Sequence, residues 1–157
     1  MPAVLADLCI EARWIVPMTV RGRVLENHTL VVRDGRILDV LPSTDALDRY
    51  AATVLVQRLE HLLMPGMINT HAHAALSLLR GQDAAISPLE APIVGPEFTR
   101  DGVLAAVAEM LSSGTTCFGD RYYYPDETAR AACDAGIRAV IGLPVAETAS
   151  QIGRAHV

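Results

Sequence analysis

The sequence predicts an α/β fold in which a small β-rich domain precedes the first strands and helices of a parallel sheet. Over residues 1–63, short apolar runs alternate with turn-forming residues, which is typical of strands. From residue 64 onward, strand-like and helix-like segments alternate, which is typical of βαβ units. The 157 residues, of which 51% are hydrophobic and 20% charged, suffice for one core, or for one small domain plus part of another.

The clearest element of the first region is a hairpin within residues 30–40. Asp34 and Gly35 separate two apolar runs, and this pair readily adopts the two positive φ angles of a type I′ turn. Residues 8–18 predict a further strand pair or a bulged strand. Residues 42–57 predict a turn and a short helix, followed by a return to strand.

Three strands and two helices are expected to alternate in the second region. The first helix has its apolar residues on one face, with Thr99 as its N-cap and Gly114 just past its end, and Gly136 closes the second helix. The expected elements are a strand in 63–74, a helix in 97–113, a strand in 115–120, a helix in 126–135 and a strand in 137–145.

Charge and composition narrow the classes of partner. Thirteen basic against eighteen acidic residues leave a net charge of −5, and the basic residues are scattered, so a nucleic-acid polymer is not an expected partner. No apolar run reaches the roughly 20 residues of a membrane helix, and the N-terminus carries acids where a signal peptide carries Lys or Arg. We therefore expect a cytoplasmic protein. Cys9, Cys117 and Cys133 are expected to be buried, reduced thiols.

Two histidines stand at the end of the first parallel strand. His71 and His73 are two residues apart, so on a strand both imidazoles point to the same side, where they can chelate a divalent metal. Active sites of parallel α/β folds gather at this end of the strands. From spacing alone, two ordinary strand histidines remain an equal alternative. His28 and His61 are isolated and are assigned no ligand role.

The surroundings of the histidine pair carry a family resemblance. LMPGMINTHAHAALSLLRG resembles the first-barrel-strand signature of the amidohydrolase superfamily. PEFTRDGVLAAVAEML, GTTCFGDRYYYPD and GIRAVIGLPV resemble the following segments of one branch, the chlorotriazine hydrolases and methylthioadenosine/S-adenosylhomocysteine deaminases. The resemblance extends from about Asp7 to Ser150, with several motifs in order and at near-family spacing.

This resemblance implies a TIM-like (β/α)8 barrel with a small β-sandwich built from both chain ends. Residues 1–63 would belong to the sandwich and residues 64–150 to a partial barrel. His71 and His73 match the two first-strand ligands of one Zn²⁺ or Fe²⁺, which activates water to attack a ring carbon and release ammonia or halide. The implied substrate is a purine nucleoside such as methylthioadenosine or S-adenosylhomocysteine, with a chlorotriazine or guanine-like ring as the alternative. Homo-oligomerisation of the full-length protein is left open.

Four further features follow from the resemblance. Glu90 matches a glutamate that contacts ribose hydroxyls in the nucleoside deaminases, the alternative being a solvated loop carboxylate. Residues 82–87 replace a longer family segment, so purine specificity stays open. Asp120 matches no family ligand and is interpreted as a hydrogen-bonding or capping residue. Tyr122 to Tyr124 are interpreted as packing at the barrel rim.

The length predicts an N-terminal fragment. A (β/α)8 barrel takes about 250 residues, and residues 64–157 have room for three strands and two helices. The later metal ligands and the acid/base groups of the family have no positions here, so no catalytic residue is assigned. Residues 151–157 are expected to be adapter read-through, because a common sequencing adapter translates as IGRAHV before a stop, and His156 is therefore excluded as a ligand.

Two classes of function are carried forward. In the first, the parent protein is a metal-dependent hydrolase of C–N or C–halogen bonds, and the 157-residue chain alone is inactive because two imidazoles supply half a coordination shell. In the second, the chain is a non-catalytic binding module or a half-protein completed by a partner chain. Aggregation of the isolated chain is expected under the first hypothesis, because strands that would cover its apolar faces are missing.

Overall fold

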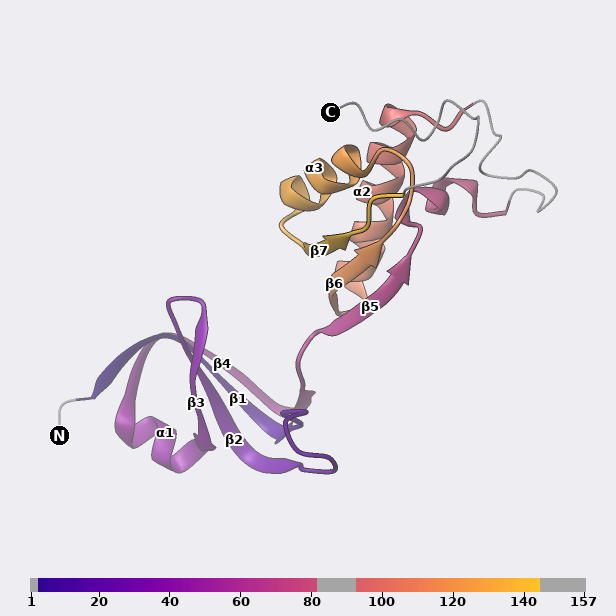
Figure 1. The fold of residues 1–157 in the computed structure, drawn as a ribbon. Coiled ribbons are helices and arrows are strands. Elements are labelled where there is room, and N and C mark those ends of the chain that lie inside the picture. Colours follow the sequence, from indigo (N-terminus) through magenta and orange to yellow (C-terminus); the bar gives the residue numbers. More distant parts are fainter. Residues whose placement is uncertain (1–2, 82–92, 145–157) are drawn as a thin grey trace. The chain divides into compact units, whose positions relative to one another are not determined.

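The computed structural model describes residues 3–81 and 93–144 and divides into two compact units (Figure 1). The division falls between Pro65 and Gly66. Each unit has its own sheet and its own buried core, and each is described by itself.

The first unit is a four-stranded sheet with one short helix. Its strand order is β3-β2-β1-β4, with antiparallel pairing of β1 to β2 and of β2 to β3, and parallel pairing of β1 to β4. Its elements are β1 (Val4–Ile15), β2 (Leu25–Arg33), β3 (Arg36–Pro42), α1 (Ser43–Arg49) and β4 (Tyr50–Leu63).

Local sequence accounts for the turns of this sheet. Asp34 and Gly35 connect β2 to β3 with φ angles of 52° and 68°, as a type I′ turn requires, so the predicted hairpin is confirmed. The pairing of β1 with β4 shifts register between Ala12 and Trp14, which confirms a bulged strand there. The short helix predicted after β3 is α1, and β4 follows it directly.

One face of this sheet is covered by α1. Ala46 of α1 packs in a core with Cys9 and Val31, and the hydroxyl of Ser43 is hydrogen bonded to that of Thr29 at 2.9 Å. Side chains alternate between the faces of a strand, so the neighbours of Cys9 and Val31 point the other way. That opposite face is apolar.

The cross-strand register arranges the opposite face in two rows. The first row runs across the four strands as Ile37, Val32, Leu8 and Val54. The second row runs as Val40, Leu30, Ile10 and Val56. Ile37 is 67% exposed and Val54 is 50% exposed, so no described element covers the outer ends of the first row.

The second unit is a parallel sheet of order β5-β6-β7, crossed by helices. Phe118 at the centre of β6 is fully buried against Val103 and Val107 of α2 and Ala131 of α3, so the helices share one core with the sheet. Its elements are β5 (Met67–Ala72), the 3₁₀ helix η1 (Ala74–Leu79), α2 (Pro96–Ser112), β6 (Thr115–Asp120), α3 (Pro125–Ala135) and β7 (Arg138–Ile141).

The start of α2 corrects one expectation. Thr99 is not the N-cap, because the helix begins at Pro96, with Gly95 as the preceding cap residue. Proline lacks an N–H and has its φ fixed near the helical value, so it favours the first helical position. Thr99 consequently lies one turn inside the helix, fully buried, and its N–H donates to the Gly95 carbonyl at 2.9 Å. The predicted end of α3 at Gly136 is confirmed.

The predicted fold class holds at the level of a mixed α/β chain with a parallel sheet flanked by helices. A β-sandwich needs two sheets, whereas residues 3–65 form one, so the sandwich stays a prediction. Cys9 is buried, but Cys117 is half-buried and Cys133 exposed, so the expectation of buried thiols is wrong for Cys133. Among the described residues, no helix is long and apolar enough to span a membrane.

Candidate metal centre

The two histidines lie where the parallel strands end. β5 carries His71 one residue before its last residue, Ala72, and His73 follows at the start of η1. The strand therefore ends two residues earlier than the sequence predicts, and of the two histidines only His71 belongs to it. Both side chains are exposed among the described residues.

The imidazole rings nevertheless converge. Nε2 of His71 and Nε2 of His73 are 3.3 Å apart, and the ring centroids are 5.1 Å apart with an interplanar angle of 80°. The predicted convergence of the two imidazole rings is therefore confirmed. Two nitrogen ligands at about 2.0–2.1 Å from a tetrahedral ion lie about 3.3–3.4 Å apart. The observed separation therefore fits two positions of one tetrahedral zinc site.

A backbone carbonyl sets the tautomer of His73. Nδ1 of His73 lies 2.8 Å from the carbonyl oxygen of Arg121, and since a carbonyl only accepts, Nδ1 carries the proton. Nε2 of His73 then presents a lone pair, and in the metal-free pair Nε2–H of His71 donates to it. A metal ion bound through both Nε2 atoms would displace that shared proton. A hydrogen bond from the non-ligating nitrogen is the usual support of a metal-binding histidine.

An open depression of about 400 Å³ surrounds His71 at the strand ends. Thr70 and His71 of β5, Gly119 and Asp120 of β6, and Gly142 after β7 contribute to its lining. Because the three strands are parallel, their carboxyl ends meet here and place residues from distant parts of the sequence around one space.

Asp120 occupies the end of β6 beside the histidines. It is only 4% exposed, and its Oδ1 accepts the N–H of Ala74 at 3.4 Å. Burial raises the pKa of the Asp120 carboxyl above its ordinary value, while the backbone N–H groups and the two imidazoles oppose that shift. The hydrogen-bonding role predicted for Asp120 is confirmed. Across residues 3–81 and 93–144, no three His, Cys, Asp or Glu side chains are grouped to hold a metal.

Tyr122 and Tyr123 pack as the sequence predicts, whereas Tyr124 is 36% exposed. Tyr122 is buried, with its ring centroid 5.9 Å from that of His73, and Tyr123 packs against the same core. Burial raises the pKa of the Tyr122 hydroxyl. Tyr122 therefore packs beside the His73 ring, whereas Tyr124 precedes α3 in a left-handed conformation.

Comparison with known proteins decides the family. The sequence profile described as "Amidohydrolase family" matches residues 62–155, more than half of the chain. The chain belongs to the amidohydrolase family. It is 43% identical over 159 aligned residues to the 5-methylthioadenosine/S-adenosylhomocysteine deaminase of Saccharophagus degradans, covering 94% of this chain and 35% of that relative.

Solved structures agree with this assignment. A crystal structure of an adenosine deaminase from Xanthomonas campestris with bound zinc is similar to this amidohydrolase chain, with a TM-score of 0.90 and 37% identity, over 97% of this chain and 37% of the other. Atrazine chlorohydrolase from Arthrobacter aurescens, complexed with zinc, shares the fold at a TM-score of 0.69 and 21% identity, over 85% of this chain and 35% of the other. The predicted resemblance is confirmed, and the chain spans about a third of the length of the curated relatives it matches.

The remaining predicted residues of this amidohydrolase chain are not part of the centre described here. Glu90, the segment 82–87 and residues 151–157 with His156 lie outside the described residues. In the first unit, Nδ1 of His28 is hydrogen bonded to the nearby carbonyl of Glu26 at 2.7 Å. Sequence reasoning missed the carbonyl of Arg121, because a backbone acceptor leaves no residue-specific signal.

Proposed function

We propose that the protein is a metal-dependent aminohydrolase of adenosine-type nucleosides, to which these residues contribute the first part of the barrel. The observation that carries the proposal is the 3.3 Å approach of two Nε2 atoms at the ends of parallel strands in an amidohydrolase chain. The name of the Saccharophagus relative and the zinc bound to the Xanthomonas structure support the reaction and the metal.

In this proposal His71 and His73 hold one Zn²⁺ or Fe²⁺ through Nε2. When bound, the ion supplies Lewis acidity that lowers the pKa of water, which is what hydrolytic removal of an amino group from a purine ring requires. The Arg121 carbonyl keeps the proton of His73 on Nδ1, and Tyr122 packs beside the His73 ring. Glu90 is proposed to contact the ribose hydroxyls of the substrate.

We further propose that residues 1–63 form one layer of a composite β-sandwich, and that residues 64–150 begin a (β/α)8 barrel. The two apolar rows on the first sheet support the sandwich, since such a face is stable only when a second layer covers it. We assign this second layer to a C-terminal segment of the longer chains found in the family.

The test completes the barrel. Residues 1–144 are joined to the remaining two thirds of the Saccharophagus relative, and ammonia release from methylthioadenosine, S-adenosylhomocysteine and adenosine is measured with added Zn²⁺. We expect turnover, and a loss of at least about 100-fold in His71→Asn and in His73→Asn, since even outer partners of metal ligands cost 10–100-fold. His28→Asn is the matched control and should keep full activity.

Two outcomes count against the proposal. One is a folded chimera whose zinc content and turnover do not change when His71 or His73 is replaced. The other is ammonia release by the 157-residue chain alone, which we expect to be indistinguishable from the blank. A folded chimera that releases chloride from a chlorotriazine, but no ammonia from any nucleoside, would move the substrate class to the triazines.

A further inference from the structure

We propose that Asp120 is a positioning residue for the histidine pair, because its buried side chain fixes the backbone that follows His73 and so directs Nε2 of His73 toward His71. This inference rests on the proposed metal-binding role of the pair. Asp120 is 4% exposed, and its Oδ1 accepts the N–H of Ala74, the residue directly after His73. Moving that N–H would rotate the His73 side chain away from its partner.

Backbone hydrogen bonds around Asp120 complete the arrangement. Its carbonyl accepts the N–H of Gly142 at 2.8 Å and thereby joins the end of β6 to the residue after β7. The next residue, Arg121, donates its N–H to the Ala72 carbonyl at 3.4 Å and accepts Nδ1–H of His73 at 2.8 Å. The ends of all three strands are therefore tied to Asp120 or to its neighbour, with His73 between them.

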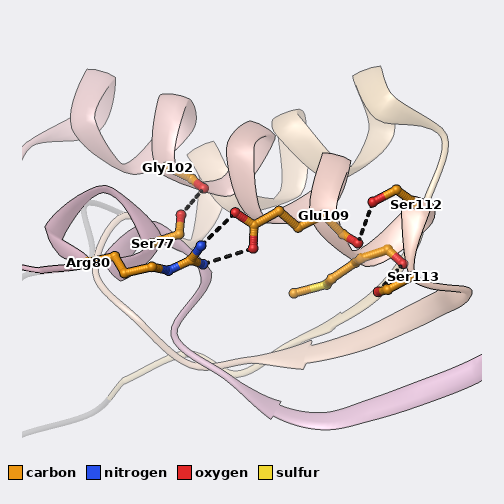
Figure 2. A network of polar contacts seen from close by, with 7 residues as sticks. Ser77, Arg80, Gly102, Glu109, Ser112 and Ser113 are labelled. Atoms are coloured by element: carbon orange, nitrogen blue, oxygen red, sulfur yellow. Dashed lines mark hydrogen bonds and ion pairs between the residues drawn. The ribbon is translucent and has the colours of Figure 1, made fainter.

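The other side of the same segment is held by α2 (Figure 2). A Cβ at Gly102 would lie 2.3 Å from the Ala75 carbonyl oxygen, so the absence of a side chain there lets η1 approach the helix closely. The hydroxyl of Ser77 donates to the Gly102 carbonyl at 2.8 Å, and the guanidinium of Arg80 donates to both carboxylate oxygens of Glu109 at 2.8 Å each. Because η1 is fixed against α2, the hydrogen bond between Ala74 N–H and Asp120 limits the remaining freedom of His73, the residue before η1.

The chemistry of Asp120 exceeds what a backbone cap needs. Its Oδ2 is buried without a hydrogen-bond partner among the described residues, which is costly for a carboxylate. An amide or a hydroxyl would cap a backbone N–H at a smaller desolvation cost. A negative charge next to two convergent imidazoles favours a bound cation, so the carboxylate suits a residue that both positions and electrostatically supports the pair.

The experiment uses the 157-residue chain labelled with ¹⁵N-histidine. Its five histidines are assigned by single substitutions to Gln, and the tautomer of His73 is read from the ring ¹⁵N shifts without metal. Zn²⁺ alone is then titrated, with His71→Asn defining the signal of the pair. The variants are Asp120→Ala, which removes the acceptor, and Asp120→Asn, which keeps an acceptor oxygen. Asp101→Ala, an exposed acid on α2, is the control.

We expect wild type, Asp101→Ala and Asp120→Asn to hold His73 as the Nδ1–H tautomer, and Asp120→Ala to lose that preference. Zinc affinity should fall about 10–100-fold in Asp120→Ala and by a smaller factor in Asp120→Asn. An Asp120→Ala chain with wild-type tautomer and affinity overturns the inference, and so does an Asn variant as impaired as Ala. If Asp120→Ala does not fold, Asp120→Ser takes its place, because its shorter hydroxyl cannot reach Ala74. If the wild-type chain, with half a coordination shell, binds no zinc through His71, the metal-free tautomer alone decides the role of Asp120, and the zinc content of the chimera decides the proposed function.

Discussion

The two units of the molecule differ in how many helices cover their sheets, with α2 and α3 on the second sheet and only the short α1 on the first. In the second unit, Phe118 on one sheet face is buried against Val103 and Val107 of α2 and against α3, while the strand ends carry polar residues and histidines. In the first unit, a short helix covers one face, and the other presents two apolar rows that end in the exposed Ile37 and Val54. The unit that carries the histidine pair is the one whose core lies under two helices, although Ile68 and Val140 of its sheet are 65% and 70% exposed.

Among the described residues, the second unit is the one whose packing can fix the orientation of a side chain at the strand ends. A metal ligand must be fixed to within a fraction of an ångström, which requires packed and hydrogen-bonded surroundings. His73 has them, through Arg121 on one side and through η1 against α2 on the other. The first unit instead presents an apolar face with exposed ends, which supports the architectural role proposed for it.

The largest effect is expected from emptying the core of the second unit. Phe118→Ala should destabilise that unit by about 3–5 kcal/mol, because it removes a fully buried aromatic ring and leaves a cavity. α2 and α3 dominate the helical circular dichroism, whereas Trp14, the one tryptophan of the chain, reports on the first unit. The helical signal should therefore melt earlier while the Trp14 fluorescence melt stays unchanged. A shift of both signals together would show that the two units unfold as one.

The sequence predicts those parts of the fold and of the site that depend on interactions between neighbouring residues. The Asp34–Gly35 turn and the end of α3 at Gly136 depend on neighbouring residues, and both were predictable. The convergence of the histidines followed from strand periodicity, although β5 ends at Ala72. The start of α2 at Pro96 was not predicted, because threonine is a common N-cap residue and Thr99 lies close by. In the structure Thr99 is buried inside the helix.

The parts that could not be predicted depend on pairing between distant segments. The Arg121 carbonyl reaches His73 only because β6 lies beside β5, and no residue type marks a backbone acceptor. Cys133 sits in an apolar run, yet its position on α3 turns it to solvent. Asp120 was recognisable as a hydrogen-bonding residue, but its partner Ala74 was not, since 46 residues separate them.

A substitution on the uncovered apolar face of the first unit is expected to change stability little but to reduce self-association clearly. Val54→Lys places a charge at the 50% exposed end of an apolar row, so it should reduce self-association of the 157-residue chain. Stability of the first unit should change by no more than about 0.5 kcal/mol, as is usual for an exposed position. Sedimentation velocity measures the association, and the Trp14 melt measures the stability.

The matched control for this change is Thr53→Lys. It adds the same charge to the same strand, one residue away, and alternation along β4 turns it to the other face. Thr53→Lys should leave self-association as it is in wild type. Equal effects of the two lysines would mean that net charge, rather than the apolar rows, governs association. A wild-type chain that is monomeric would remove the support for a missing second layer and favour a self-sufficient binding module.

The smallest effect is expected at the ion pair that joins the segment after η1 to α2 (Figure 2). Hydrogen bonding to Arg80, reinforced by its charge, holds the pKa of Glu109 below its ordinary value of 4.5. A lowered pKa in the folded state means that the pair stabilises the second unit above about pH 4.5 and loses that contribution as the pH falls below it. Both side chains are more than half exposed, so solvent and salt screen the interaction.

Glu109→Gln should therefore lower the helical melting temperature slightly at neutral pH and leave it at the wild-type value under acid conditions. Asp101→Asn, on the same helix but in no ion pair within the described residues, should show no such pH-dependent difference. A Glu109→Gln chain that is destabilised equally at both pH values would show that the carboxylate acts through packing rather than through its charge.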